Sequence, residues 1–417
     1  MRIVSTLALA IALGGAVAAA PAYAKDKKEE AAPAPKYSPA VQKALIAAQA
    51  ALKANDAAGA ATQIAAAKAA GLTTADDKNA TGSLEYQLYQ INKDPALLSD
   101  GVDLMISSGK AGANLSQLLS VQAQIAFQAK DYTKAANSSS EALKAGSTEA
   151  SLVPIQVTSL SNLGRTAEAL NALNAYIDKA NAAGQQVPVE WFQRGLAIGY
   201  TSKATTDAEA IRASTSEITR KWVAAYPTKQ NWNDSLVTYL SQYKVPTDVQ
   251  VDVFRLLRAA GALLSDGNYR EYASNIYLRY PGETMSVLQE GGTKGVLNLT
   301  GKNEATDLLG IVKAKTAADK ASLPASDKTA RTAADGKAAL STADAYVGYG
   351  MYPQAIDLYK VALSKGADAA TVNLHMGWAM ALSGDSAGAK TAFGQVTGIR
   401  KPLADFWIVH LDHPTVG

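Results

Sequence analysis

The three histidines are the residues whose type and spacing first suggest chemistry. His410 and His413 flank an aspartate in the segment His410-Leu411-Asp412-His413, and imidazole together with carboxylate is a donor set that binds zinc and related ions. However, Pro414 follows at once, the segment lies in the tail, and no third ligand stands at a suitable spacing. A solvated or packed tail is therefore favoured, and no metal site is predicted. His375 lies in a helical pattern, where a hydrogen-bonded core or groove histidine is expected.

Motifs for nucleophilic or phosphate chemistry do not stand out in the sequence. The glycine-containing segment 290–295 is a turn without phosphate-binding spacing, and no G-x-S-x-G elbow is present. Acidic pairs such as Glu190 with Asp207 are typical of solvated helix faces rather than of paired catalytic carboxylates. A non-catalytic protein without a cofactor is therefore predicted. An enzyme whose site has no recognisable pattern is the less favoured alternative.

Composition indicates an all-α protein. Alanine is very abundant and charged residues are 18% of the 417 residues, below the usual quarter. Alanine is the strongest helix former and lets packed helices approach closely, whereas period-two runs of β-branched and aromatic residues are lacking. The absence of cysteine from the sequence excludes disulfides, iron–sulfur clusters and cysteine-ligated zinc.

The first residues have the pattern of an export signal. Arg2 is the only charge before Lys25, residues 3–20 are almost wholly apolar or small, and a small-x-small cleavage pattern ends at Ala24. Residues 1–24 are predicted to be a signal peptide cleaved after Ala24, which places the mature chain in the periplasm, with secretion as the alternative. Residues 25–38 combine charges with Pro-Ala alternation and are predicted to be a disordered linker.

A fixed spacing organises the helical part of the chain. Ala135 and Ala169 stand 34 residues apart, and so do Ala355 and Ala389, each in a similar turn-then-helix context. A period of this length is typical of stacked helix-turn-helix units.

The charge of the mature chain is nearly balanced, with 39 basic against 37 acidic side chains once Arg2 is removed. The sequence also has no tracts of basic residues, so nothing in it indicates nucleic-acid binding.

These segments resemble tetratricopeptide repeats (TPRs), as found in exported bacterial proteins of unassigned role. The resemblance is firmest in the C-terminal pair and weaker in the first pair. It implies that small residues lie where the two helices of a unit cross and that aromatic residues fill the space between units. The residues that match are Ala123, Tyr132, Ala135, Ala169, Ala343, Tyr352, Ala355, Tyr359, Ala362, Gly377, Ala389 and Phe393. The family's proline near the end of each unit is absent from three units, and Pro402 comes one place late in the fourth.

The predicted fold is a TPR-like α-solenoid in three parts. Residues 39–183 form an N-terminal helical-hairpin array, residues 187–300 an irregular helical middle segment, and residues 301–417 a C-terminal array with a tail. Within the last part, residues 301–335 are expected to form helices joined by a loose turn at 322–327, with a mobile connector as the alternative.

The resemblance also implies a binding groove lined by the first helix of each unit. The positions that it assigns to this groove are Gln117, Gln124, Phe127, Asp344, Leu374 and Trp378. Phe127 and Trp378 are expected to face solvent in part and to anchor a partner segment, unless they pack against the neighbouring hairpin. The predicted function is a periplasmic scaffold or adaptor for a protein or peptide partner in the cell envelope, with no transmembrane segment in the mature chain.

A second hypothesis uses aromatic residues of the middle segment. Aromatic rings with amide and guanidinium neighbours can stack on the sugar rings of a glycan or of peptidoglycan. The candidates are Trp191, Arg194, Trp222, Tyr226, Asn231, Trp232 and Tyr239. The alternative for these residues, which the irregular pattern favours, is that they fill a core.

Overall fold

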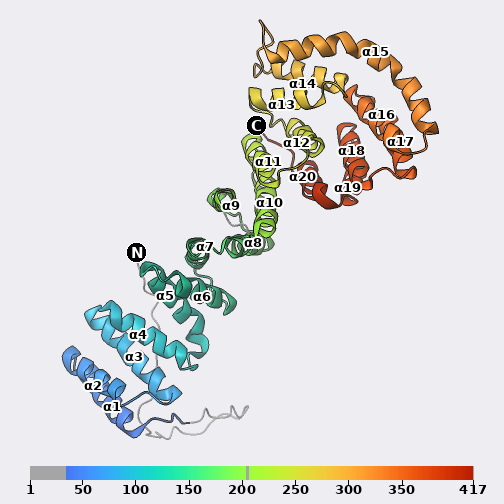
Figure 1. Ribbon diagram of the computed structural model, residues 1–417. Coiled ribbons are helices and arrows are strands. Elements are labelled where there is room, and N and C mark those ends of the chain that lie inside the picture. The colour runs from blue at the N-terminus through green and yellow to red at the C-terminus, as the bar shows by residue number, and fades with distance from the viewer. Residues whose placement is uncertain (1–33, 203–205, 417) are drawn as a thin grey trace. The chain divides into compact units, whose positions relative to one another are not determined.

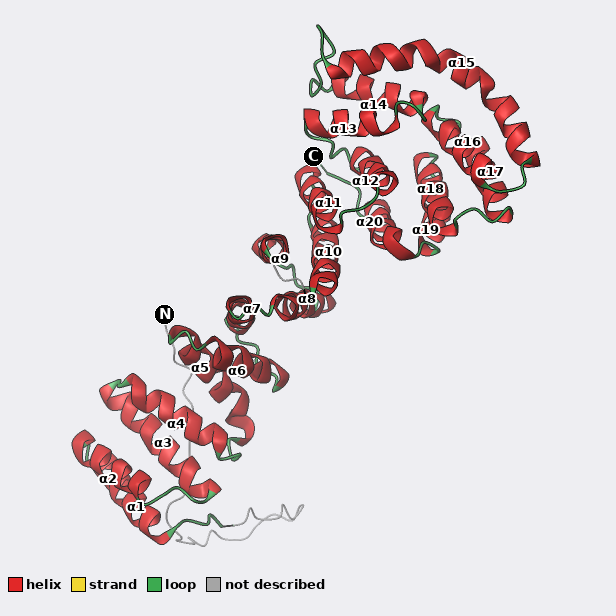
Figure 2. Cartoon of the chain, viewed as in Figure 1, coloured by secondary structure: helices red, strands yellow, loops and turns green. Residues whose placement is uncertain are grey.

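The computed structural model describes residues 34–202 and 206–416, and the chain divides into two compact units, Met1–Leu173 and Asn174–Gly417. Throughout these ranges the regular elements are helices, as Figure 2 shows, and extended backbone pairs only in an isolated bridge between Thr228 and Val416. The predicted all-α class is therefore confirmed. None of the described helices is both long enough and apolar enough to span a membrane.

Unit 1 is a stack of helical hairpins (Figure 1). Successive helices pack against one another from α1 to α7, so each hairpin covers the apolar face of the next, which is the arrangement predicted for an α-solenoid. The helices of this unit are α1 (Pro39–Lys53), α2 (Ala57–Ala69), α3 (Ala75–Asn92), α4 (Pro95–Ser107), the 3-10 helix η1 (Gly112–Asn114), α5 (Leu115–Gln128), α6 (Tyr132–Lys144), α7 (Leu152–Asn162) and the first part of α8 (Thr166–Ala182).

The turns of the α1–α2, α3–α4 and α5–α6 hairpins share one chemistry. A residue with left-handed backbone ends the first helix, and an aspartate that caps the second helix follows directly. Asn55 precedes Asp56, whose carboxylate accepts the backbone N–H of Gly59 at 2.8 Å. Lys130 precedes Asp131, whose carboxylate accepts the backbone N–H of Lys134 at 3.0 Å. The left-handed residue reverses the chain, and the carboxylate satisfies an N–H that the helix leaves unpaired.

Unit 2 contains the remaining helices, of which α10 to α20 share one continuous core from Val223 to Trp407. After the last part of α8 come α9 (Val189–Thr201), α10 (Ala208–Ala225), α11 (Lys229–Tyr243), α12 (Thr247–Ala259), α13 (Asp266–Ile276), α14 (Pro281–Thr293), α15 (Glu304–Thr332), α16 (Lys337–Gly348), α17 (Tyr352–Ser364), α18 (Ala369–Leu382), α19 (Ser386–Gly394), the 3-10 helix η2 (Gly398–Arg400) and α20 (Lys401–Asp412). The predicted boundary near residue 300 is not a boundary between units, because residues on both sides of it contribute to this core.

Residues 301–335 form one helix rather than two. α15 runs for 29 residues straight through the predicted turn at 322–327, with Pro324 inside it. It begins at a capping box, in which Asn303 accepts the N–H of Thr306 and the Thr306 hydroxyl accepts that of Asn303. The helix curves around the outside of α14, α16 and α17 (Figure 1). Leu308, Val312 and Leu323 bury its inner face, and this packing offsets the hydrogen bond that the proline removes.

The C-terminal end of unit 2 returns to its beginning. α20 packs against α10 and α12, and Phe406 lies 6.1 Å from Trp232 between ring centroids. Arg220 of α10 pairs with Asp405 at 3.0 Å, and the N–H of Val416 donates to the carbonyl of Pro227 at 2.8 Å. Unit 2 is therefore closed on itself instead of ending in an open helix face.

The segment before α1 is bound to the start of α3. The N–H of Lys36 donates to Asp76 at 2.7 Å, and the hydroxyl of Ser38 donates to Asp77 at 2.7 Å. The described end of the predicted 25–38 linker is thus fixed by hydrogen bonds. The predicted signal peptide, residues 1–24, lies outside the described residues.

Candidate functional site

The groove positions predicted in unit 1 keep part of their surface. Gln117, Gln124 and Phe127 lie along α5 and are all half-buried. The Gln124 amide donates to the Ser151 hydroxyl at 3.2 Å, and the Phe127 ring meets Tyr132 edge-on, with ring centroids 6.2 Å apart. This face therefore offers an aromatic ring and two amide side chains that are already positioned by their neighbours. Their role in binding stays a prediction.

The groove positions predicted in unit 2 have no such surface. Asp344, Leu374 and Trp378 are 2%, 1% and 5% exposed, so the expected solvent-facing position of Trp378 is wrong. At Trp378 the reason is that side chains of α12 reach α18, and Asp344 is enclosed by hydrogen bonds from Tyr280, Tyr359 and His375. The Arg255 guanidinium of α12 lies 4.2 Å from the centroid of the Trp378 ring. A cation over an aromatic face is attracted to it, most strongly to tryptophan.

Arg255 belongs to a set of buried charged side chains that we call the buried ion network. It is composed of Asp252, Arg255, Glu283, Asp344, His375 and Arg400, all less than a tenth exposed. Arg255 binds Glu283 through two parallel hydrogen bonds of 3.0 Å each, and Asp252 at 3.1 Å. Arg400 donates to the second oxygen of Asp252 at 3.0 Å. Paired, bidentate contacts of this kind are what makes buried charge tolerable.

His375 lies at the centre of the network. Its Nε2 is 2.8 Å from Asp252 of α12, and its Nδ1 is 2.7 Å from Asp344 of α16. Burial opposes the charged imidazolium, but the two carboxylates outweigh it and raise the pKa of His375 to about 9. Burial likewise opposes the charged form of Asp344, yet His375, Arg255 and the hydrogen bond from Tyr359 lower its pKa to about 2.

The network is balanced and fully bonded. Three carboxylates face two guanidinium groups and one imidazolium, and each carboxylate oxygen accepts at least one hydrogen bond. Tyrosine hydroxyls complete it: Tyr272 donates to Glu283 at 2.5 Å, and Tyr280 to Asp344 at 2.8 Å. Such an arrangement fixes the register of α12, α14, α16 and α18 rather than presenting a free acid or base to solvent.

The sequence predicts His375 as a hydrogen-bonded core or groove residue and Asp344 as a groove residue, but it assigns no role to the other members of the network. Asp252 and Arg255 stand three apart in α12, where their apolar neighbours Val251, Val253 and Phe254 are buried. Opposite charges at this spacing within an apolar run were the available signal, because an isolated charge is rarely tolerated there. No comparable signal exists for Glu283 or Arg400, which reach the network from distant segments.

The residues assigned to repeat packing do pack. Ten of the twelve are buried, and Tyr132 and Tyr352 are half-buried. Gly377 shows why a small residue is required, since a Cβ placed on it would stand 2.6 Å from the Phe393 ring. The Tyr359 hydroxyl also donates to Asp344 at 2.6 Å, so one packing residue joins the buried ion network.

The aromatic residues of the middle segment do not form an exposed platform. Trp222, Trp232 and Tyr239 are 2%, 0% and 3% exposed, which agrees with the core alternative. Trp191 is half-buried against Tyr176, with ring centroids 5.5 Å apart, and Tyr226 donates to the carbonyl of Val187 at 2.8 Å. The exposed stacking surface that a glycan site at these aromatic residues requires is therefore not found.

The two tail histidines have different surroundings in the structure. His410 packs perpendicular to Trp232 and close to Trp407, and burial lowers its pKa, whereas His413 is exposed. In the part of the chain that the structure describes, no group of three or more histidine, aspartate and glutamate side chains is arranged to hold a metal ion.

Comparisons with known proteins give little beyond the fold. No family model matches the sequence, and no curated protein matches it. Among solved structures, a chain from the structure titled "Structure of Naa15/Naa10 bound to HypK-THB" is similar at 15% sequence identity with a TM-score of 0.26. The alignment covers 85% of the present chain, which spans 57% of the length of that chain. A TM-score this low assigns no function, so the all-α hairpin fold stands on the helices described above.

Proposed function

We propose that the protein is a non-catalytic scaffold that binds a protein or peptide partner on the α5 face of unit 1, formed by Gln117, Gln124 and Phe127. The observation that carries the proposal is a contrast between the units. The α5 face keeps a half-exposed aromatic ring beside amide side chains, whereas Trp378, the aromatic residue predicted for the groove of unit 2, is buried under Arg255 of α12.

Physical chemistry supports this choice of face. A half-buried phenylalanine loses little side-chain freedom on binding and contributes apolar area, which is typical of residues that dominate interface energies. The face is also formed before a partner arrives, because Gln124 and Phe127 are held by Ser151 and Tyr132. A preformed surface does not have to be ordered during binding, and the affinity is higher for that reason.

We also propose that the scaffold works in the periplasm. The support is the leader-like segment 1–24 and the absence of cysteine from the sequence. Osmotic-shock fractionation of the native bacterium, with N-terminal sequencing of the released protein, tests this directly. A mature N-terminus at Lys25 in the periplasmic fraction is expected. Recovery of the intact leader in the cytoplasmic fraction would contradict it.

Photocrosslinking tests the binding face. A benzophenone amino acid is placed at Gln124 in the full chain, and the matched control carries it at Glu141, an exposed position of α6. A discrete crosslinked partner is expected from position 124 and not from position 141. The identified partner is then purified, and its affinity for the Phe127→Ala protein is expected to fall about tenfold or more. Equal affinity for the variant and the parent would refute the assignment of this face.

A further inference from the structure

A second surface of unit 1 has a composition suited to recognition. An open cavity of about 350 Å³ lies between α6, α7 and α8, a size at the lower end of the range of small ligand pockets, roughly 300–1,000 Å³. Its polar lining consists of Asn137, Ser140, Gln156, Arg165, Glu168 and Asn171. None of these residues belongs to the α5 face.

Three of the lining side chains are available for hydrogen bonding. The side chains of Asn137, Ser140 and Gln156 make no hydrogen bond to another residue of the described ranges, and all three keep solvent access. Each carboxamide presents two N–H donors and one carbonyl acceptor, and the hydroxyl can serve as either. The cavity therefore offers donors and acceptors side by side, with no protein group competing for them.

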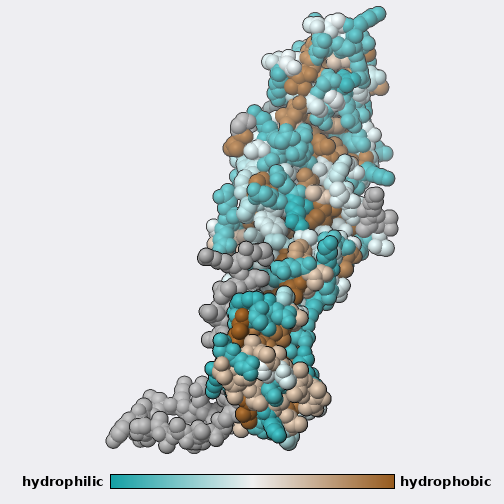
Figure 3. Space-filling model, turned by 90° about the vertical axis from the view of Figure 1, so that its left-hand side faces the viewer, coloured by the Kyte–Doolittle hydropathy of each residue, from teal (hydrophilic) through white to brown (hydrophobic). Residues whose placement is uncertain are grey.

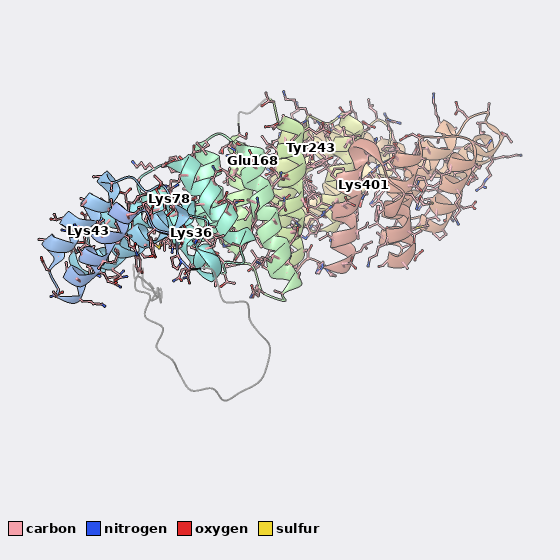
Figure 4. The ribbon with its side chains drawn as sticks, turned by 90° about the horizontal axis from the view of Figure 1, so that it is seen from below. Lys36, Lys43, Lys78, Glu168, Tyr243 and Lys401 are labelled. Carbon is pink, nitrogen blue, oxygen red and sulfur yellow. The ribbon has the colours of Figure 1, made fainter. Side chains whose placement is uncertain are left out.

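The charged residues at this cavity are already occupied with each other. Arg165 donates to both oxygens of Glu168, at 2.7 and 2.6 Å. Figure 4 labels Glu168 on α8. This bidentate pair leaves no unbalanced charge in the lining, so the cavity has no electrostatic preference for an acidic or a basic ligand.

We infer that this cavity binds the main chain of an extended, uncharged peptide segment. A peptide unit presents one N–H and one carbonyl, and a side-chain carboxamide can pair with both of them. A sugar is a poorer match, because none of the lining residues is aromatic and a sugar ring finds no face to stack on. The inference rests on the proposed scaffold function and adds a contact for a partner's main chain that is separate from the α5 face.

The test uses the purified full chain and an array of N-acetylated, C-amidated decapeptides. One set carries only uncharged side chains, and a second carries acidic or basic ones; chitotriose is the sugar probe. Uncharged peptides are expected to bind, and Asn137→Ala combined with Gln156→Ala is expected to weaken them about tenfold. The matched control is Asn162→Ala, an exposed asparagine of α7 outside the lining, which is expected to leave their affinity unchanged.

Salt and charge variants complete the test. Raising NaCl from about 0.05 to about 0.5 M is expected to change the affinity of the uncharged peptides less than about twofold, since no unpaired charge takes part. The double substitution Arg165→Gln and Glu168→Gln is likewise expected to change the affinity of the uncharged peptides less than about twofold. The inference is overturned if no uncharged peptide binds, if only charged peptides bind, or if chitotriose binds and the Asn137/Gln156 variant abolishes it. A partner that still crosslinks from position 124 after such a result would leave the proposed function intact.

Discussion

The Arg255 guanidinium stacks on the ring of Trp378, 4.2 Å from its centroid, and so joins α12 to α18 inside the core of unit 2. The repeat pattern places Trp378 in an open groove, but in the structure the face of its ring is covered by an arginine of the same chain. The Arg255 side chain also donates hydrogen bonds to the buried carboxylates of Asp252 and Glu283. Trp378 is therefore a stabilising residue, and its removal has a specific expected effect.

Trp378→Ala is expected to destabilise unit 2 by about 3–5 kcal/mol, because it removes a large buried ring and exposes the Arg255 guanidinium to a cavity. Urea unfolding followed by tryptophan fluorescence measures this, since all five tryptophans lie in unit 2. Partner binding on the α5 face is expected to persist. Trp191→Ala changes a half-buried tryptophan and is the matched control; it should lower the free energy of unfolding by less. Equal effects of the two substitutions would contradict the core role of Trp378.

His375→Gln is expected to cost about 3–5 kcal/mol of folding free energy, since it leaves Asp252 and Asp344 buried without their shared cation. The same urea titration at neutral pH measures the loss. His413→Gln changes an exposed histidine and should lie within about 0.5 kcal/mol of the parent. If both variants unfold at the parent midpoint, His375 is not charged in the folded protein.

Alkaline pH should weaken unit 2 through the same histidine. The pKa of His375 is raised from 6.5 to about 9 in the folded protein, so its contribution is fully present below pH 6.5 and is lost as the pH rises through 9. The shift corresponds to roughly 3 kcal/mol. Urea midpoints of the parent should fall between pH 6.5 and 9, and those of His375→Gln should change much less. A parent midpoint that is flat over this range would rule out the raised pKa.

Two glycine-to-alanine substitutions should act in opposite directions. Gly377→Ala places a methyl group 2.6 Å from the Phe393 ring and is expected to cost about 1–3 kcal/mol through overpacking. Gly310 lies exposed inside α15, with open space around its Cβ position, so Gly310→Ala should stabilise the protein by about 0.5–1 kcal/mol. Thermal unfolding monitored by circular dichroism compares them. Shifts of the same sign would show that helix propensity, not packing, dominates at Gly377.

The parts of the fold that were predictable depend on neighbours in the sequence. The 34-residue alanine spacing marks helix crossings, and those alanines are fully buried. The turns carry a local signal as well, a left-handed residue followed by an aspartate cap at Asn55-Asp56 and Lys130-Asp131. Such features are set within one or two helical turns, so a single sequence reveals them.

The parts that escaped prediction depend on distant contacts. Arg400 reaches Asp252 across 148 positions, and nothing local to either residue announces the pairing. The covering of Trp378 by Arg255 of α12 has the same origin, which is why Trp378 was expected to be exposed. The expected turn at 322–327 is a different case. Proline favours a break by its local geometry, but Leu323 before Pro324 and Ala330 after it are both buried, and this packing keeps α15 continuous.

The return of α20 to α10 and α12 determines how unit 2 comes apart. A linear stack can lose its terminal hairpin first and shorten one repeat at a time, because the last repeat touches only one neighbour. In unit 2 the last helix contacts α10 and α12, and the Arg220–Asp405 and Val416–Pro227 bonds tie the C-terminal end to α10 and to the residues that follow it. Backbone amides of α10 and α20 should then exchange with solvent together, in a single opening of the whole unit, whereas α1 and α2 of the open stack should fray by themselves.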